Sequence, residues 1–158
     1  MRIVERLVVS CGVALSLIFL WHAHCGANRV AAAQPQQPIT VTRLYTGTDG
    51  LTHTEQVPLK LSPVAGAPAT VQESEHIRAT NAYVVRPAPG FFEGWHNADE
   101  RRYVVTISGR AEVEVAGSQK VSVAPGNISL AEDLTGKGHT FRVVGNEDWV
   151  ALFVDFAR

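Results

Sequence analysis

Two histidines and the charged residues near the first of them are the positions in this sequence best suited to chemistry. His96 is followed by Glu100 and Arg102, and His139 stands in a second segment that is rich in glycine. Imidazole nitrogens bind divalent metals, transfer protons and form hydrogen bonds, and a guanidinium binds a carboxylate through two parallel hydrogen bonds. These residue types therefore allow two kinds of site, one that holds a metal ion and one that binds a small anion.

Strands are the elements that must position these residues. Short apolar or alternating runs recur from residue 39 onward, and no segment shows the spacing of apolar residues that a helix requires. The alternation is clearest in 111–115 and 120–123. The sequence predicts strands at 39–45, 52–57, 76–85, 102–107, 111–115, 120–123, 128–131, 139–144 and 149–156.

The turns between these runs support the same fold class. Segments 108–109, 116–118 and 125–127 contain glycine and have the spacing of consecutive antiparallel hairpins. So many short strands must bury their edges in a sandwich or a barrel. We therefore predict an all-β domain.

The composition permits one buried core and excludes some partners. The chain has 158 residues, of which 46% are hydrophobic, and its 14 Lys and Arg nearly balance its 15 Asp and Glu. A net charge of −1 provides no basic surface for nucleic acid, so we expect no nucleic-acid partner. We expect a small-molecule ligand and a homodimer, because an exposed edge strand in such a domain is commonly covered by a second copy.

The N-terminus has the organisation of an export signal. Arg2 and Arg6 precede an apolar run at 7–21, which has the length of a secretory signal core and is short for a membrane-spanning helix. Small residues follow, and we predict cleavage after Ala33, with Ala27 as the alternative. We expect a periplasmic or extracellular protein, attached to a membrane only if the signal stays uncleaved.

This signal defines the expected domain organisation. Residues 1–33 would be the signal peptide, 34–38 a flexible arm and 39–158 the folded domain. Both cysteines, Cys11 and Cys25, precede the expected cleavage point. The exported domain would therefore contain neither a disulfide nor a thiolate ligand.

The segment around the first histidine resembles the first motif of the cupin superfamily, G-x5-H-x-H-x3,4-E-x6-G. Residues 90–96 match G-x5-H, and 102–109 have the x6-G spacing that ends the motif. Gly136 and His139 match part of the second motif, P-x-G-x2-H. The resemblance implies that 39–158 form a cupin domain, a jelly-roll barrel also called a double-stranded β-helix, with its site inside the barrel.

The first motif is degenerate at two positions that hold metal in cupins. The family's four ligands correspond to His96, Ala98, Arg102 and His139. Alanine cannot bind a metal, and arginine brings a permanent positive charge to a place where the family has a carboxylate. The resemblance therefore implies that the usual metal site is incomplete.

A metal site could be rebuilt from neighbouring carboxylates. On a regular strand Glu100 would share a face with His96, which would give a set of two histidines and one carboxylate with His139. Such a set suits Fe, Mn, Zn or Ni. Glu132 and Asp133 are further candidates for the carboxylate.

The same residues can also be interpreted without a metal. Glu100 would then neutralise Arg102, or Arg102 would bind a carboxylate or another small anion. Three hypotheses stay open: a small-molecule-binding cupin, a metal-dependent enzyme of the oxygenase or isomerase type, and a structural or sensory module. The sequence does not decide whether the protein is an enzyme. The residues expected to bind the ligand are His96, Arg102, His139, Tyr103 and Trp95.

Overall fold

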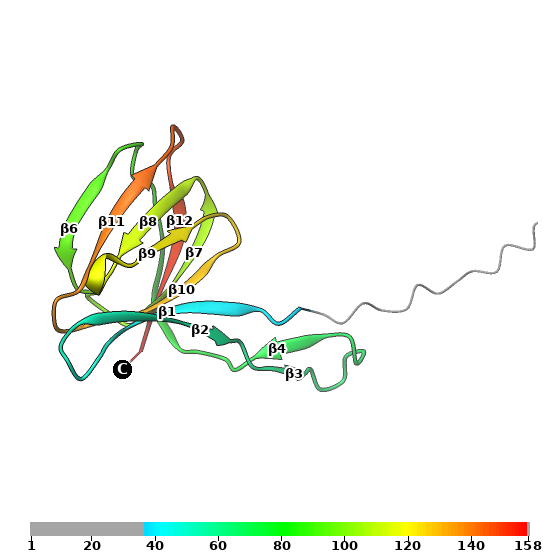
Figure 1. Ribbon diagram of the computed structural model, residues 1–158. Coiled ribbons are helices and arrows are strands. Elements are labelled where there is room, and N and C mark those ends of the chain that lie inside the picture. The colour runs from blue at the N-terminus through cyan, green and yellow to red at the C-terminus, as the bar shows by residue number, and fades with distance from the viewer. Residues whose placement is uncertain (1–36, 158) are drawn as a thin grey trace, which may run out of the picture. The chain divides into compact units, whose positions relative to one another are not determined.

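The computed structural model of the chain describes residues 37–157, and these residues are almost entirely β-structure. Its twelve strands are shown in Figure 1. The only helical element among the described residues is a short turn of 3-10 helix at Ala116–Ser118, and none of their helices is long and apolar enough to cross a membrane. The strands are β1 (Thr40–Thr46), β2 (Thr52–Pro58), β3 (Leu61–Pro63), β4 (Gln72–Ser74), β5 (Ala79–Val85), β6 (Phe92–His96), β7 (Arg102–Ser108), β8 (Arg110–Glu114), β9 (Lys120–Val123), β10 (Ile128–Glu132), β11 (His139–Val144) and β12 (Val150–Phe156).

The strand order is that of a jelly roll. One sheet has the order β2-β1-β10-β7-β12-β5, and a second has the order β6-β11-β8-β9. The eight strands from β5 to β12 therefore divide into two groups of four, β5, β7, β10 and β12 in the larger sheet and β6, β8, β9 and β11 in the smaller one. This topology confirms the all-β, double-stranded β-helix fold predicted from the sequence.

The turns have a different role from the one predicted. Of the strand pairs that these predicted turns join, only β8 and β9 form a hairpin, whereas β7 and β8 lie in different sheets, as do β9 and β10. The turns at 108–109 and 125–127 are thus corners between sheets. Gly109 shows why such a corner needs glycine: its φ is +73°, and a Cβ there would lie 2.3 Å from the carbonyl oxygen of Asp148.

The core lies between the two sheets. Inward residues of β8 alternate with outward ones, so Ala111 and Val113 are buried while Glu112 and Glu114 lie toward the surface. Partly buried Val104, Phe141 and Phe153 pack against the buried core. The buried core cluster consists of Leu44, Ala111, Val113, Val115, Val123, Val143, Trp149 and Ala151.

An N-terminal hairpin extends the larger sheet. β1 pairs with β10 in parallel, which places Leu44 beside Ala131. β1 also pairs with β2 in antiparallel fashion, and the turn that joins them accepts a hydrogen bond at Gly50 O from Lys137 N, at 3.0 Å. This hairpin therefore supports the loop that leads into β11, where His139 begins the strand.

The structure describes only part of the predicted domain organisation. The first described strand begins at Thr40, next to the expected start of the domain at residue 39. The predicted signal peptide and most of the predicted arm lie outside the described residues.

Candidate functional site

A cavity of about 440 Å³ lies between the two sheets. Its polar lining comes mainly from His96, Arg102 and His139, together with Glu93 and Asp99. Its wall is otherwise mostly apolar, formed by Leu44, Val85, Pro87, Phe91, Ala98, Val104, Val113, Val123, Ala131, Phe141, Trp149 and Phe153. Volume and lining are those of a small-molecule site with few polar groups.

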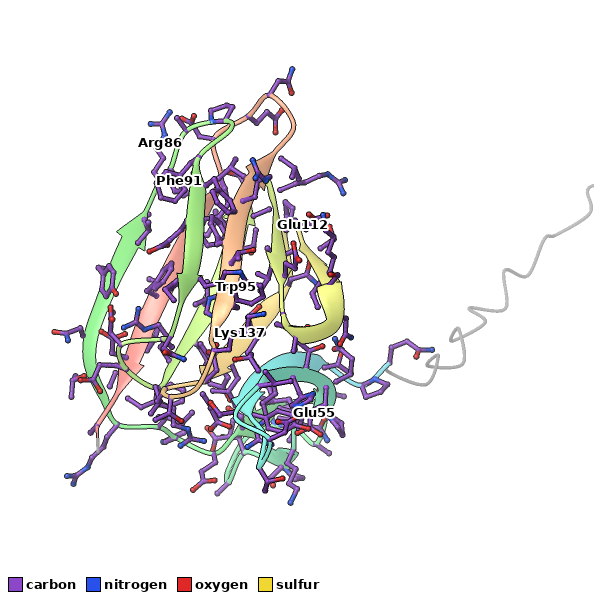
Figure 2. The ribbon with its side chains drawn as sticks, turned by 60° about the vertical axis from the view of Figure 1, so that its left-hand side comes forward. Glu55, Arg86, Phe91, Trp95, Glu112 and Lys137 are labelled. Atoms are coloured by element: carbon purple, nitrogen blue, oxygen red, sulfur yellow. The ribbon has the colours of Figure 1, made fainter. Side chains whose placement is uncertain are left out.

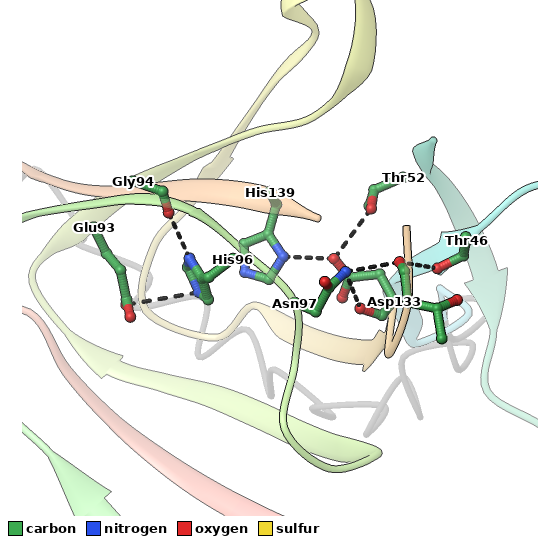
Figure 3. Close-up of polar contacts among 9 residues, drawn as sticks. Thr46, Thr52, Glu93, Gly94, His96, Asn97, Asp133 and His139 are labelled. Carbon is green, nitrogen blue, oxygen red and sulfur yellow. Dashed lines mark hydrogen bonds and ion pairs between the residues drawn. The ribbon is translucent and has the colours of Figure 1, made fainter. Parts of the chain in front are cut away.

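The topology brings the predicted histidines together at one end of this cavity. β6 ends at His96, and β11 begins at His139 directly opposite it in the register. Their ring centroids are 4.4 Å apart (Figure 3). Arg102, the first residue of β7, also lines the cavity. Residues of both motifs therefore lie together at this end of the cavity.

His139 is held in place by a buried carboxylate. Its Nδ1 lies 2.6 Å from Oδ2 of Asp133, whose side chain is fully buried (Figure 3). Thr52 of β2 donates a hydrogen bond to the same oxygen at 3.2 Å. Because a carboxylate oxygen accepts, Nδ1 of His139 carries the proton and Nε2 is left for the cavity. The N-terminal hairpin therefore takes part in orienting the site.

His96 is oriented by its own strand. Its Nδ1 donates to the carbonyl oxygen of Gly94 at 2.8 Å, and its Nε2 lies 3.6 Å from Oε2 of Glu93. A distance of 3.6 Å is too long for a direct hydrogen bond between these two atoms. Glu93 and His96 nevertheless both line the cavity.

A β-bulge explains how two residues three positions apart face the same side. His96 pairs with His139 and Glu93 pairs with Phe141, so two residues of β6 lie opposite the single residue Thr140. The extra residue reverses the alternation of side chains along β6. Without this bulge, Glu93 and His96 would lie on opposite faces of the strand.

Arg102 is paired with a residue that the sequence did not suggest. Its Nε lies 2.9 Å from Oδ1 of Asp155, which is opposite Arg102 in the pairing of β7 with β12. Both side chains are buried, at 11% and 5% exposure. The angle at this contact is poor for a hydrogen bond, so the interaction is an ion pair. The charge of Arg102 is therefore compensated within the protein.

Glu100 does not share a strand face with His96. β6 ends at His96 and β7 begins at Arg102, so Glu100 belongs to the loop between them and is not part of the cavity wall. The expected alternation fails because it assumed an uninterrupted strand. The ion pair of Arg102 that the structure shows is with Asp155, whereas the sequence suggested Glu100 as one possible partner.

Tyr103 and Trp95 lie outside the cavity wall. Tyr103 follows Arg102 on β7 and so faces the other side of the sheet, where its ring meets that of Phe156 edge to face at 5.0 Å. Trp95 is 44% exposed, and the Lys137 ammonium lies 4.1 Å from its ring centroid. Figure 2 shows the side chains of Trp95 and Lys137 next to each other. Neither aromatic residue is placed to contact a ligand in the cavity.

The two other candidate carboxylates have different positions. Asp133 accepts a hydrogen bond from Nδ1 of His139. Glu132 instead accepts hydrogen bonds from Arg43 and Arg101. Burial raises the pKa of Glu132, but these two guanidinium groups outweigh it and leave the pKa below its usual value. Glu132 therefore joins β10 to β1 and to the 97–101 loop.

Two acidic residues have roles that the sequence did not predict. Glu93 would lie on the wrong face of a regular strand, and only the bulge brings it to His96. Asp155 is far from Arg102 in the sequence but opposite it in the sheet. Asp155 interrupts an otherwise apolar segment, 150–156, and a polar residue in such a segment could have indicated a buried partner.

The residues present do not fit the metal site that the cupin resemblance implies. Ala98 and Arg102 occupy two ligand positions, and Arg102 is held by Asp155. Within residues 37–157, no group of three or more His, Cys, Asp or Glu residues is arranged to hold a metal ion. The set of His96, His139 and Glu100 is not assembled, since Glu100 lies away from the cavity wall.

Several solved structures of cupin or double-stranded β-helix proteins are similar to parts of this chain. No family model and no curated protein matches the chain. A cupin-2 domain protein from Shewanella frigidimarina is similar at 12% identity and a TM-score of 0.38, over 52% of this chain and 80% of that one. A double-stranded β-helix protein from Klebsiella pneumoniae has 21% identity and a TM-score of 0.40, over 61% and 82%. A cupin 2 barrel protein from Salinispora arenicola has 16% identity and a TM-score of 0.40, over 72% and 81%. These likenesses concern the fold alone.

Proposed function

We propose that this cupin-like jelly roll is a small-molecule-binding protein. The observation that carries the proposal is the cavity of about 440 Å³, whose wall is mostly apolar and includes the polar side chains of His96, Arg102 and His139. An apolar ligand body would replace water along the wall, which is favourable because it removes apolar surface from water. A polar group of the ligand would meet His96 and His139.

The aromatic residues give this cavity a suitable wall for a ring. Phe141 lies between Phe91 and Trp149, at centroid distances of 6.4 and 4.7 Å, and Trp149 meets Phe153 at 6.2 Å. All four line the cavity. Such rings pack favourably against a flat apolar ligand.

The ion pair of Arg102 bears on the anion hypothesis. That hypothesis needs a positive charge that the protein leaves uncompensated, and Asp155 lies 2.9 Å from Arg102. Binding of an anion would have to compete with this buried carboxylate. The pairing favours a ligand whose affinity comes from its apolar body.

Ethylbenzene is a suitable probe of the cavity because it has no polar group. The full chain carrying Trp21→Phe and Trp95→Phe keeps Trp149, a cavity residue, as its fluorescent reporter. We expect saturable quenching and a higher Tm on addition of ethylbenzene. Ala131→Phe, which fills the cavity, should abolish both effects.

The control is the same substitution at an exposed strand position, Ala82→Phe, which leaves the cavity open. If Ala131→Phe and Ala82→Phe bind ethylbenzene equally well, the cavity is not the binding site. Absence of saturable binding to the parent protein would also overturn the proposal.

We also propose that the protein is exported, with residues 1–33 removed. Support comes from the basic residues and the apolar run at the N-terminus. N-terminal sequencing of the protein recovered outside the cytoplasm should begin at residue 34, or at residue 28 if cleavage follows Ala27. A retained Met1 would contradict cleavage.

A further inference from the structure

The hydrogen bonds of the two histidines fix what each offers to a ligand. Nδ1 of His139 donates to Asp133, and Nδ1 of His96 donates to the carbonyl oxygen of Gly94. A neutral imidazole that donates at Nδ1 presents a lone pair at Nε2. Both rings therefore offer hydrogen-bond acceptors at this end of the cavity.

Glu93 adds a third acceptor. Its Oε2 lies 3.6 Å from Nε2 of His96, so two acceptors face each other at a separation that a donor group could bridge. This pair of side chains therefore attracts a donor more than it attracts an anion.

The charges around the cavity lead to the same conclusion. Of the two arginines that line it, Arg102 is paired with Asp155 at 2.9 Å, and Arg86 donates to Asp148 at 2.6 Å. Glu93 and Asp99 also line the cavity, and neither has an Arg or Lys within ion-pair distance among residues 37–157. Carboxylate charge therefore exceeds the free positive charge on the cavity wall.

We infer that the polar end of the cavity selects a hydrogen-bond donor, a primary ammonium or a hydroxyl group, carried on an aromatic body. This inference rests on the proposed small-molecule binding and names the class of ligand. The donor group would be received by Nε2 of His96 and of His139 and by Glu93, and the ring by the wall around Phe141 and Trp149. Carboxylates would be disfavoured, because they bring only further acceptors.

Four compounds that share one ring test this selection. Ethylbenzene, 2-phenylethanol, 2-phenylethylamine and phenylacetate would be titrated into the full chain, with and without EDTA, by calorimetry and by the shift in Tm. We expect 2-phenylethylamine to bind about tenfold or more tightly than phenylacetate, which corresponds to 1.4 kcal/mol or more. Ethylbenzene and 2-phenylethanol should lie between them, with the alcohol tighter.

Glu93→Gln isolates the role of the carboxylate. Glu93 is exposed on an edge strand, so the protein should fold normally. We expect the affinity for 2-phenylethylamine to fall about fivefold while that for ethylbenzene stays unchanged. Glu112→Gln is the matched control, since Glu112 pairs with Lys120 at 2.7 Å and is not part of the cavity wall.

The outcomes separate the two proposals. Equal binding of all four compounds, or tightest binding of phenylacetate, would overturn the inference and leave small-molecule binding in place. Binding that disappears when EDTA is added would assign the polar end to a metal ion and also overturn the inference. No binding of any compound, ethylbenzene included, would overturn both.

Discussion

Gly138 and His96 are in direct backbone contact, because a Cβ built on Gly138 would lie 1.9 Å from the carbonyl oxygen of His96. Gly138 also has a φ of +76°, which side-chain-bearing residues rarely adopt. This contact sets the end of β6 against the start of β11, and so fixes the separation of the two histidines. No larger residue can stand at 138 without moving one strand from the other.

Gly138→Ala should therefore damage both stability and the site. We expect a loss of about 3 kcal/mol or more in the free energy of unfolding, measured by urea denaturation, since strain and a backbone clash add. Gly90→Ala is the control, because Gly90 has a similar φ of +79° with no atom within 4 Å of a Cβ. It should cost only about 1 kcal/mol. Equal losses in the two variants would argue against the backbone contact.

Asp133 should position His139 rather than contact a ligand. With the imidazole nitrogens labelled, nitrogen NMR of the full chain should show His139 protonated at Nδ1 and unprotonated at Nε2. Asp133→Asn should weaken this preference and lower the free energy of unfolding by about 2 kcal/mol. Thr52→Val, which removes the second hydrogen bond to Asp133, should cost about 1 kcal/mol and leave the preference intact. A His139 that carries its proton on Nε2 in the parent protein would refute this assignment.

Arg102 and Asp155 should behave as one unit. Arg102→Leu leaves a buried carboxylate without its cation, so we expect a loss of about 3 kcal/mol in the free energy of unfolding. Asp155→Leu leaves the buried Arg102 without its carboxylate and should lower the free energy of unfolding by a similar amount. The double variant should lose clearly less than the sum of the two, by about 2 kcal/mol. Strict additivity in this double-mutant cycle would show that the pair does not interact.

Glu132 should make stability depend on pH. Its pKa is lower in the folded protein, where Arg43 and Arg101 donate to it, than in the unfolded chain. The contact therefore stabilises the protein above the ordinary pKa of a glutamate, and this stabilisation disappears as the pH falls through the folded-state pKa. Glu132→Gln should cost about 1 kcal/mol at pH 7, since both arginines are partly in solvent.

The difference between Glu132→Gln and the parent protein should vanish at a pH below the folded-state pKa of Glu132, where both carry a neutral side chain. Glu55→Gln is the control, because Glu55 is exposed and contacts only Arg43 of these two arginines. Its effect should stay within a few tenths of a kcal/mol. A pH-independent effect of Glu132→Gln would contradict the ionic origin.

A homodimer remains a prediction, and β5 is the strand to test. Its seven residues, 79–85, include no charged residue and no proline, and Val84 is 61% exposed. The edge strand at the other side of the same sheet carries Glu55 and Pro58, and the two edge strands of the smaller sheet carry Glu93 and Lys120. Such residues discourage pairing with another chain, so β5 is the edge left open to a second copy.

Val84→Lys should convert a dimer into a monomer in sedimentation velocity. Val71→Lys is the control, because Val71 is also exposed, at 44%, but lies outside β5. A monomeric parent protein, or a dimer insensitive to Val84→Lys, would exclude this interface.

The sequence predicted the long strands well because their side chains alternate. Segments 120–123 and 139–144 were predicted with the bounds of β9 and β11. β3 and β4 have only three residues each, too few for alternation to show. β6 was missed as a strand because it contains a glycine and a bulge, which interrupt the pattern. Turn residues marked where strands end, but not which strands pair.

The residues that line the cavity were easier to identify from the sequence than the interactions between them. Family spacing was enough to bring His96, Arg102 and His139 to one cavity. The partners that determine their chemistry, Asp133 and Asp155, depend on register and burial, which a linear pattern does not contain. Tyr103 was placed in the site by its nearness to Arg102, although neighbours on a strand face opposite sides.

The bulge in β6 makes the character of the cavity sensitive to strand register. If residues 92–93 slid by one position along β11, pairing would become regular and the Glu93 side chain would turn outward. The barrel would keep its pocket but lose a carboxylate from its polar end. A register shift at this single point is thus a simple evolutionary route by which related barrels could change the class of ligand that they bind.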